Sequence, residues 1–558
     1  MITRKHSLRF VLIFLGLISC LIVFGIKLIL IQSFGSAHLV KLAKKQHNSL
    51  IDLEPKRGTI FDRNLRPLAF NVPVFSFFAN PRVMSSRDRD QALSVLPGML
   101  GIPREELARK LSERKYFVWI KRKISKDLAM ELNKINLNGF GFRKESKRYY
   151  PNQNLAAHII GFAGVDNEGL EGLELFYNKD LRGEQGWMRI IKDARQRQLL
   201  ISDEIAPPKD GLNLVLTIDE TIQFIAEHAL EKGFIKNNAK AGSIIVVDVK
   251  TGEILALANK PTYNLDNVSQ SNLENRTNRA LSFVYEPGSI FKIVTAAAAL
   301  EEGAFKETDR INCENGKYRV ASNILHDHTP HGTITFREVI EVSSNIGVTK
   351  IAQKLGADKV YKYAHRFRFG QKTGIDLKGE VAGILKHPKV WSKTSIGAIP
   401  IGHEVLSTPL QLVCSLAAVA NGGVYMKPYI VKYIKDNNDV IIRQFFPQEV
   451  DRIISEETAF RLKEILVGVT ENGTAKSARI KGIRVAGKTG TSQKVEGKVY
   501  SHSRFYASFM GFAPADNPRL AAIVVYDEPH PYYFGGVVSA PVFREVMENS
   551  LKYLEAKE

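Results

Sequence analysis

The chain has 558 residues, of which 44% are hydrophobic and 24% are charged, and it carries a formal net charge of +20 at pH 7. This length and composition predict two to four globular domains with a large core. Three cysteines are too few for a disulfide scaffold. The excess of Lys and Arg is spread along the chain without a nucleic-acid-binding motif. It therefore indicates a protein that acts close to anionic lipids and polymers, and it argues against nucleic-acid binding.

An apolar segment close to the N-terminus predicts a membrane anchor. Phe10–Ile26 contains no charged residue, and the apolar character continues past Lys27 to Ile31. The segment is long enough to span a bilayer, and it lacks the short apolar core and small-residue cleavage site of a signal peptide. We expect a tail over residues 1–9 and a single uncleaved transmembrane anchor over residues 10–31.

Charge does not fix the orientation of this anchor, because basic residues flank it on both sides. They are Arg4, Lys5, Arg9, Lys27, Lys41, Lys44 and Lys45. Leu17–Cys20 resembles a lipoprotein processing box, but the apolar run continues well past Cys20, which disfavours lipidation. Cys414 lies in an apolar run and is predicted to be buried. Free thiols are expected, and a Cys313–Cys414 bond stays an open alternative.

Residues 32–205 form a mixed region of short strand-like runs, polar helices and many basic residues. Arg57–Asn64 within it is typical of a strand that enters a tight polar turn. No nucleophile–base constellation is evident in this region, so we predict a non-catalytic N-terminal pedestal. The Pro- and Gly-containing cluster Ala206–Gly211 predicts the boundary to a second domain over residues 206–558.

The second domain is predicted to have an α+β fold, with helices packed on a mainly antiparallel sheet. The strand signals are Ser243–Val249, Glu253–Ala258, Arg504–Phe512 and Leu520–Tyr526. The helical signals are Glu220–Lys232, Ile290–Glu301, Phe336–Leu355, Pro409–Ala420, Glu456–Val469 and one closing helix after Pro541.

A serine and a lysine near the start of the Ile290–Glu301 helix predict acyl-transfer chemistry. Ser289 follows Pro287 and Gly288, which mark a helix start, and Lys292 comes three residues later on the same helix face. The hydroxyl would then lie at the positive end of the helix dipole with an amine beside it. This arrangement activates a weak nucleophile without a histidine.

One Ser-x-x-Lys pattern proves little, and Ser112–Lys115 in a charged stretch is interpreted as chance. Ser289 is singled out by the motifs that follow in order, Ser343-Ser344-Asn345 and then Lys488-Thr489-Gly490-Thr491. Two other Lys-Thr-Gly copies are set aside. Lys250–Gly252 divides two apolar runs like a hairpin turn, and Lys372–Gly374 precedes a polar loop.

Three histidines close to one aspartate raise the alternative of a metal site. His326, His328 and His331 surround Asp327, but Pro330 and Gly332 make the segment turn-like. A zinc site needs converging ligands, which this spacing does not establish. We expect no metal and no cofactor.

The chain resembles a class B penicillin-binding protein of the division (septal) type over nearly its whole length. The resemblance rests on the anchor, Arg57–Asn64, Arg148–Gly161, Thr217–Asp219, Ile401–Gly402, Thr408–Gln411, Tyr533–Phe543 and the three motifs. The glycosyltransferase domain of class A enzymes has no counterpart. One departure is Asn64-Leu65, where the family usually has Asn-Gly.

The resemblance implies a serine D,D-transpeptidase that cross-links peptidoglycan stem peptides ending in D-Ala-D-Ala and is trapped by β-lactams. Ser289 would be the nucleophile and Lys292 the general base. Ser343 would relay the proton and Asn345 would bind Lys292 and the substrate amide. Lys488 would supply positive potential near the substrate carboxylate.

The same resemblance assigns the remaining site residues. Thr489 and Thr491 would bind the substrate carboxylate, and Gly490 would let the substrate backbone lie along the strand. The backbone N–H groups of Ser289 and Thr491 would form an oxyanion hole, worth roughly 3–4 kcal/mol per donor. Individually, Ser289 could be only a helix cap, Asn345 a turn former and Lys488 a solvated strand end.

Location and partners follow from the resemblance as well. We expect a single-pass protein of the cytoplasmic (inner) membrane with its catalytic domain on the outer, periplasmic side. A septal glycosyltransferase and other division proteins are the expected partners. Alternatives that stay open are a serine β-lactamase or D,D-carboxypeptidase, in which water is the acceptor, and an idle scaffold or β-lactam sensor. The acceptor diamine and the oligomeric state are not determined by the sequence.

Overall fold

The computed structural model describes residues 4–33, 48–113, 115–192, 198–497 and 499–557. The chain divides into two compact units, the first made of Met1–Lys56 with Gly183–Asp210 and the second of Arg57–Arg182 with Gly211–Glu558. Most of the predicted pedestal therefore packs in one unit with the predicted second domain. The domain limit at residue 205 stays a prediction.

The first unit contains the anchor helix and a small sheet. Helix α1 covers Arg4–Ser33, and Ser7–Gln32 is the only segment of the described residues that is long and apolar enough to cross a membrane. The sheet is antiparallel with β6 in the middle. Its strands are β1 (Asn48–Leu53), β6 (Gly186–Lys192) and β7 (Gln198–Ala206).

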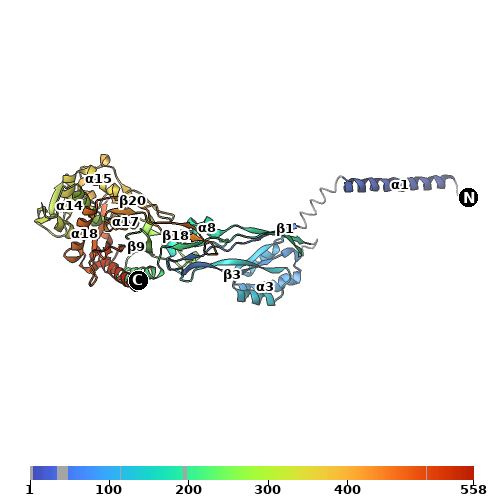
Figure 1. Ribbon diagram of the computed structural model, residues 1–558. Helices are drawn as coiled ribbons and strands as arrows, with labels where there is room; N and C mark the ends of the chain where they lie inside the picture. The colour runs from blue at the N-terminus through green and yellow to red at the C-terminus, as the bar shows by residue number, and fades with distance from the viewer. Residues whose placement is uncertain (1–3, 34–47, 114, 193–197, 498, 558) are drawn as a thin grey trace. The chain divides into compact units, whose positions relative to one another are not determined.

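In the second unit, a seven-stranded sheet joins the predicted pedestal to the predicted second domain. The order is β19-β18-β8-β2-β3-β4, with β5 also paired to β3, and β2 runs parallel to β8. In Figure 1 the long strand β3 leads away from the helix-rich body toward α3. The strands are β2 (Ile60–Phe61), β3 (Pro67–Ala79), β4 (Val118–Ile124), β5 (Phe140–Tyr149), β8 (Asn213–Leu216), β18 (Val431–Lys435) and β19 (Ile441–Gln444).

The far part of β3 and three helices enclose a small separate core. Phe77, Leu96, Leu107 and Ile120 are among its buried side chains. The helices of this part are α3 (Ser86–Leu100), α4 (Arg104–Ser112) and α5 (Lys126–Lys134). Three short helices follow before the second domain, namely α6 (Ala157–Ile160), α7 (Gly172–Phe176) and α8 (Asn178–Arg182).

The main core surrounds a five-stranded antiparallel sheet with the order β10-β9-β23-β22-β21. Its strands are β9 (Ala241–Asp248), β10 (Ile254–Lys260), β21 (Ala486–Glu496), β22 (Val499–Ala513) and β23 (Leu520–Asp527). Contacts place α9 (Glu220–Lys236) and α20 (Ala540–Glu555) together against the sheet, whereas α17 (Pro409–Ala420) and α18 (Glu456–Glu471) pack with one another and against it. The predicted antiparallel sheet flanked by helices is confirmed.

The remaining elements are short, apart from three helices beside the nucleophile segment. These helices are α12 (Lys292–Glu301), α14 (Asn345–Leu355) and α15 (Ala357–Arg366). The short helices are α10 (Leu273–Arg276), α11 (Arg279–Ser282), α13 (Phe336–Glu341), α16 (Ser395–Ala398) and α19 (Gly535–Val538). The two-stranded sheets are β11 (Arg310–Asn312) with β14 (Thr333–Thr335), β12 (Lys317–Val320) with β13 (Asn323–His326), β15 (Ile384–Leu385) with β16 (Val405–Leu406), and β17 (Val424–Met426) with β20 (Glu449–Arg452).

The single helix predicted over Phe336–Leu355 is wrong, because α13 ends at Glu341 and α14 begins at Asn345. Ser343 lies between them with φ +62°, a left-handed conformation that no α-helix accommodates. The side chain of Ser344 caps α14 by accepting a hydrogen bond from the N–H of Gly347.

A second left-handed residue lies at Asn64-Leu65, where the family usually has Asn-Gly. Leu65 has φ +64° in the turn between β2 and β3 and is half exposed. Glycine adopts this conformation without steric cost, whereas a leucine does not. Asp62 holds the turn by accepting hydrogen bonds from the N–H groups of Asn64 and Arg66.

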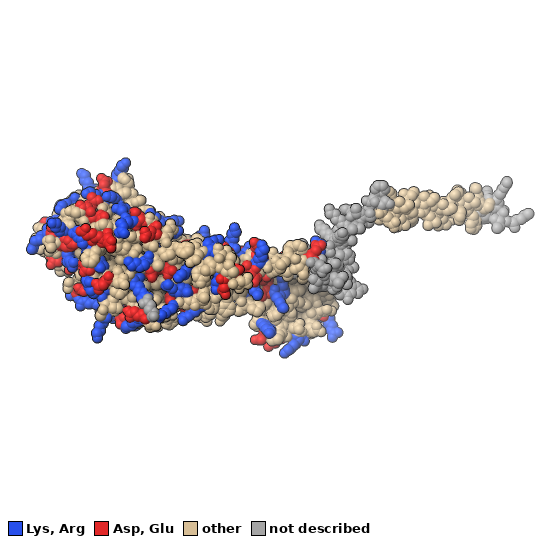
Figure 2. Space-filling view, in the orientation of Figure 1, with Lys and Arg blue, Asp and Glu red and all other residues tan. Residues whose placement is uncertain are grey.

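The state of the cysteines and the distribution of the surface charge both bear on the sequence predictions. All three cysteines are free, as expected, and Cys414 is buried. On the face drawn in Figure 2, Lys and Arg side chains are intermixed with Asp and Glu side chains over the second unit. The positive charge of this face is therefore dispersed and forms no continuous basic track.

Candidate active site

Ser289 lies in a tight turn between two segments that are distant in sequence. The turn is a 3₁₀ helix over Gly288–Phe291 that continues into α12. Gly288 has φ +57°, and a Cβ on it would lie 3.0 Å from the carbonyl oxygen of Thr491 in β21. On the other side, its N–H donates to the carbonyl oxygen of Gly402 at 3.2 Å. The position before Ser289 therefore requires glycine.

The Lys292 amine is fully buried and contacts only uncharged oxygens. Its Nζ donates to the carbonyl oxygen of Ser343 at 2.6 Å, to Oδ1 of Asn345 at 2.7 Å and to Oγ of Ser343 at 3.2 Å. Burial lowers the pKa of Lys292 to about 7, and the nearby Asp327 carboxylate only partly opposes this. Near neutral pH the amine is therefore unprotonated in a large fraction of molecules.

No hydrogen bond joins the Ser289 hydroxyl to the Lys292 amine among the described residues. Catalytic hydrogen bonds are often long before substrate binds, so this geometry does not disqualify the pair. Because Lys292 follows Ser289 by three residues on the same turn of helix, the two side chains start from neighbouring positions.

The Ser343 hydroxyl, which lies beside the Lys292 amine, also contacts the buried amine of Lys488. Its Nζ donates to Oγ of Ser343 at 2.8 Å, so this serine lies between the two lysines. Burial lowers the pKa of Lys488 well below the ordinary value, and the positive charge of Lys292 lowers it further. Two amines bridged by one hydroxyl form a route along which a proton can move.

Asp327 was not predicted as a site residue, and it fixes the Ser343–Asn345 segment. Its carboxylate accepts from Oγ of Ser344 at 2.6 Å and from the N–H groups of Asn345 at 2.5 Å and Ile346 at 3.0 Å. It therefore satisfies the open N–H groups at the start of α14. An aspartate directly before a helix is a sequence signal for such a cap. Asp327 gives no such signal, because it lies in a separate segment well before the start of α14.

The Lys-Thr-Gly-Thr motif lies in β21, at the edge of the five-stranded sheet. Oγ1 of Thr489 lies 2.9 Å from Oγ1 of Thr474, and Oγ1 of Thr491 accepts from the N–H of Gly535 at 3.1 Å. A Cβ on Gly490 would lie 2.4 Å from Oγ of Ser508. Packing within the protein is therefore one reason for this glycine.

The sequence copies that were set aside lie elsewhere. Lys250–Gly252 forms the turn between β9 and β10, as predicted, and Lys372–Gly374 lies in a loop without regular structure. Ser112 is an exposed residue at the end of α4. The three predicted motifs, in contrast, come together around the Lys292 and Lys488 amines.

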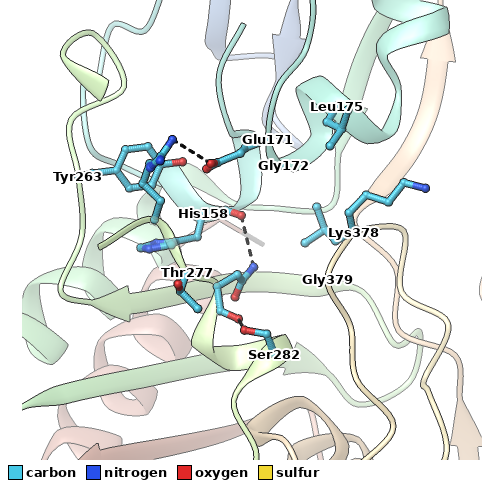
Figure 3. A pocket seen from close by; sticks show the side chains of 12 residues that line it. His158, Glu171, Gly172, Leu175, Tyr263, Thr277, Ser282, Lys378 and Gly379 are labelled. Atoms are coloured by element: carbon cyan, nitrogen blue, oxygen red, sulfur yellow. Dashed lines mark hydrogen bonds and ion pairs between the residues drawn. The ribbon is translucent and has the colours of Figure 1, made fainter. Parts of the chain in front are cut away.

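A separate cavity of about 250 Å³ lies where α6 and α7 meet the loops of the second domain. Figure 3 shows His158, Glu171 and Tyr263 on its wall, with Lys378 and Gly379 across from Glu171. None of the motif residues lines it. It belongs to the junction between the two sequence regions and not to the catalytic centre.

Comparison with known proteins identifies the family of this chain. Residues 242–548 match the family described as penicillin binding protein transpeptidase domain, and residues 52–216 match the penicillin-binding protein dimerisation domain. The chain belongs to the class B penicillin-binding proteins. It is accordingly a serine-type peptidoglycan D,D-transpeptidase.

Similar proteins cover nearly the whole chain. Stage V sporulation protein D of Bacillus subtilis is 34% identical over 100% of this chain and 87% of its own length. The peptidoglycan D,D-transpeptidase FtsI of Escherichia coli is 33% identical over 94% of this chain and 88% of its own length. Penicillin-binding protein 3 of Mycobacterium tuberculosis, solved with aztreonam, superposes with a TM-score of 0.71. It is 26% identical and covers 90% of this chain and 97% of its own.

Proposed function

We propose that Ser289 attacks the carbonyl between the two terminal D-alanines of a stem peptide, with Lys292 as the general base. The observation that carries this proposal is the buried Lys292 amine, which contacts only neutral oxygens and has a pKa near the working pH. The base takes the hydroxyl proton as the Ser289–carbonyl bond forms. The tetrahedral intermediate then collapses to an acyl-enzyme and releases D-alanine.

Ser343 and the second lysine serve proton transfer and substrate binding. The Ser343 hydroxyl, between Nζ of Lys292 and Nζ of Lys488, passes the proton to the leaving amine. Asn345 holds Lys292 and binds the substrate amide. Lys488 supplies positive potential toward the substrate carboxylate when it is protonated.

The β21 strand completes the donor site. Thr489 and Thr491 bind the terminal carboxylate through their hydroxyls, and the substrate backbone lies along Gly490 as an added strand. The N–H groups of Ser289 and Thr491 bind the oxyanion. The closeness of the Gly288 backbone to Thr491 supports this pairing. An amine of a second stem peptide then attacks the acyl-enzyme and forms the cross-link.

Labelling with a fluorescent penicillin tests the nucleophile. We expect a covalent band on the wild-type protein that is lost in Ser289→Ala and kept in Ser112→Ala, a matched control in the other Ser-x-x-Lys pattern. Folded wild-type protein that takes no label contradicts the proposal and favours an idle scaffold. Product analysis with an added amine acceptor separates transpeptidation from D,D-carboxypeptidation, in which water accepts the acyl group.

Location and partners extend this proposal. The apolar helix 7–32 anchors the chain in the inner membrane, with the tail inside and the catalytic domain outside, where peptidoglycan lies. Relatives named FtsI and stage V sporulation protein D support a role in septal wall synthesis, with a septal glycosyltransferase and other division proteins as partners. Residues 32–205 act as the pedestal and residues 206–558 as the transpeptidase domain.

A further inference from the structure

Three residues that no motif includes meet beside the nucleophile turn. Glu286 is only 8% exposed, and its carboxylate accepts three hydrogen bonds. Nδ1 of His403 lies 2.8 Å from Oε2, and the Tyr500 hydroxyl and the N–H of Glu404 donate to Oε1 at 3.2 Å and 2.9 Å. A buried carboxylate is stable only with such donors, and here they come from two distant segments.

The carboxylate determines which partner donates in each hydrogen bond. A carboxylate only accepts, so Nδ1 of His403 carries a hydrogen and donates a hydrogen bond to Glu286. The Tyr500 oxygen lies 3.1 Å from the same Nδ1, and the two rings pack edge to face at 5.0 Å. Burial raises the pKa of Tyr500, and the Glu286 charge raises it further, so the hydroxyl keeps the proton that it donates.

The segment that carries His403 also holds the nucleophile turn. A Cβ on Gly402 would lie 2.1 Å from the carbonyl oxygen of Gly288, and Tyr285 and Ser407 exchange backbone hydrogen bonds of 3.1 Å and 3.0 Å. Glu404 has φ +59° in this segment, and that strained conformation directs its N–H to Glu286.

Tyr500 comes from the other wall of the site. It lies in β22, close to the tip of the hairpin whose first strand, β21, carries the Lys-Thr-Gly-Thr motif. Val495 of β21 pairs with Tyr500. The Glu286, His403 and Tyr500 cluster therefore ties the outer part of this hairpin to the segment that ends at Ser289.

We propose that His403 and Tyr500 are positioning residues, which hold the nucleophile turn and the β21–β22 hairpin in register through Glu286. This inference rests on the proposed role of Ser289. The two side chains hydrogen-bond to Glu286, so their loss misplaces the Ser289 hydroxyl relative to the β21 strand. The acylation step then slows while binding of the donor stays unchanged.

Stopped-flow acylation by a chromogenic β-lactam tests the proposal on the full-length protein in detergent. It separates the dissociation constant of the initial complex from the acylation rate constant. We expect Tyr500→Phe and His403→Ala each to lower the acylation rate constant about tenfold, as for one lost hydrogen bond to a charged group, with an unchanged dissociation constant. His403→Asn should restore most of the rate, because its amide can donate to Glu286 in place of Nδ1.

Tyr149→Phe, on the exposed side of β5, is the matched control and should react like the wild type. Wild-type rates in Tyr500→Phe and His403→Ala, equal changes in both constants, or no recovery in His403→Asn would each overturn the proposal. If His403→Ala does not fold, Tyr500→Phe and His403→Asn still decide it. Failure of the wild type to react would overturn the role of Ser289 and the positioning role with it.

Discussion

Two buried clusters in the second unit each hold two basic side chains, but they treat the charge differently. In the first, Nε of Arg57 and Nε of Arg148 each lie 2.6 Å from a carboxylate oxygen of Glu174, and all three side chains are almost fully buried. In the second, the amines of Lys292 and Lys488 share Oγ of Ser343 and have no carboxylate among their hydrogen-bond partners.

The first cluster is built to keep its charge. Arg57 also donates to the carbonyl oxygens of Asn167 and Glu174 and to Oδ1 of Asn178, and Arg148 donates to the carbonyl oxygen of Gly58. Guanidinium groups stay protonated in proteins, so such a site needs an anion and many acceptors. It joins the segment ahead of β2 to β5 and α7 and has a structural role.

The second cluster, which contains the Lys292 and Lys488 amines, favours loss of their protons. A lysine amine can release its proton, and burial without a paired anion favours the neutral form. The depressed pKa values of Lys292 and Lys488 have this cause. The difference between the clusters is that the first pairs its buried basic groups with an anion, whereas the second leaves its buried amines unpaired, as the proposed general base requires.

The largest expected effect comes from removing the base. Lys292→Met should lower the rate of penicillin acylation by about a thousandfold, within the usual contribution of a general base. Acylation kinetics measure it, and a thermal melt verifies that the variant is folded. A folded variant that acylates within tenfold of the wild type would show that the unpaired amine is not the base.

Removing the Glu174 carboxylate from the first cluster should lower stability and leave the acylation rate unchanged. Glu174→Gln leaves two buried guanidinium groups without their carboxylate and should destabilise the fold by about 3–5 kcal/mol. Denaturant unfolding measures this loss. The protein that remains folded should acylate at the wild-type rate, and a selective loss of acylation with full stability would break the distinction between the clusters.

Asp327→Asn sharpens the comparison, because the Asp327 charge opposes the loss of the Lys292 proton. The variant loses the bond from Oγ of Ser344, so acylation should fall about tenfold through misplacement of Asn345. Removal of a negative charge also favours the neutral amine, so the acylation pH profile should shift to lower pH. A shift to higher pH would contradict the assigned electrostatics.

The smallest effect is expected at the β2–β3 turn. Leu65→Gly relieves the left-handed strain of a leucine and should stabilise the protein by about 1 kcal/mol. Acylation should not change. Differential scanning calorimetry with parallel labelling measures both quantities, and a lower melting temperature would show that the turn tolerates leucine without strain.

The sequence pattern predicted nine elements of the second domain to within about five residues. They are the strands β9, β10, β22 and β23 and the helices α9, α12, α17, α18 and α20. Pro409–Ala420 is α17 as predicted, because Thr408 and Gln411 form a capping box ahead of a continuous apolar run. The break at Ser343 could not be predicted in this way. The local sequence favours a helix, and the segment is held open by Asp327 from another strand–turn region.

The candidate site was predictable in its residues and not in its electrostatics. The order of the three motifs identified Ser289, Lys292 and Lys488 as candidates, whereas their burial and the lack of a paired carboxylate depend on packing. The Glu286, His403 and Tyr500 cluster left no sequence signal, because its members lie far apart along the chain.

The pH dependence of Ser289 acylation tests the central claim most directly. Lys292 is protonated below its pKa and acts as a base above it, so the acylation rate should rise about tenfold per pH unit below 7. It should reach half of its maximum near pH 7 and then level off. A rate that stays flat between pH 5 and 9, or that keeps rising to pH 10, would contradict an amine held neutral by burial.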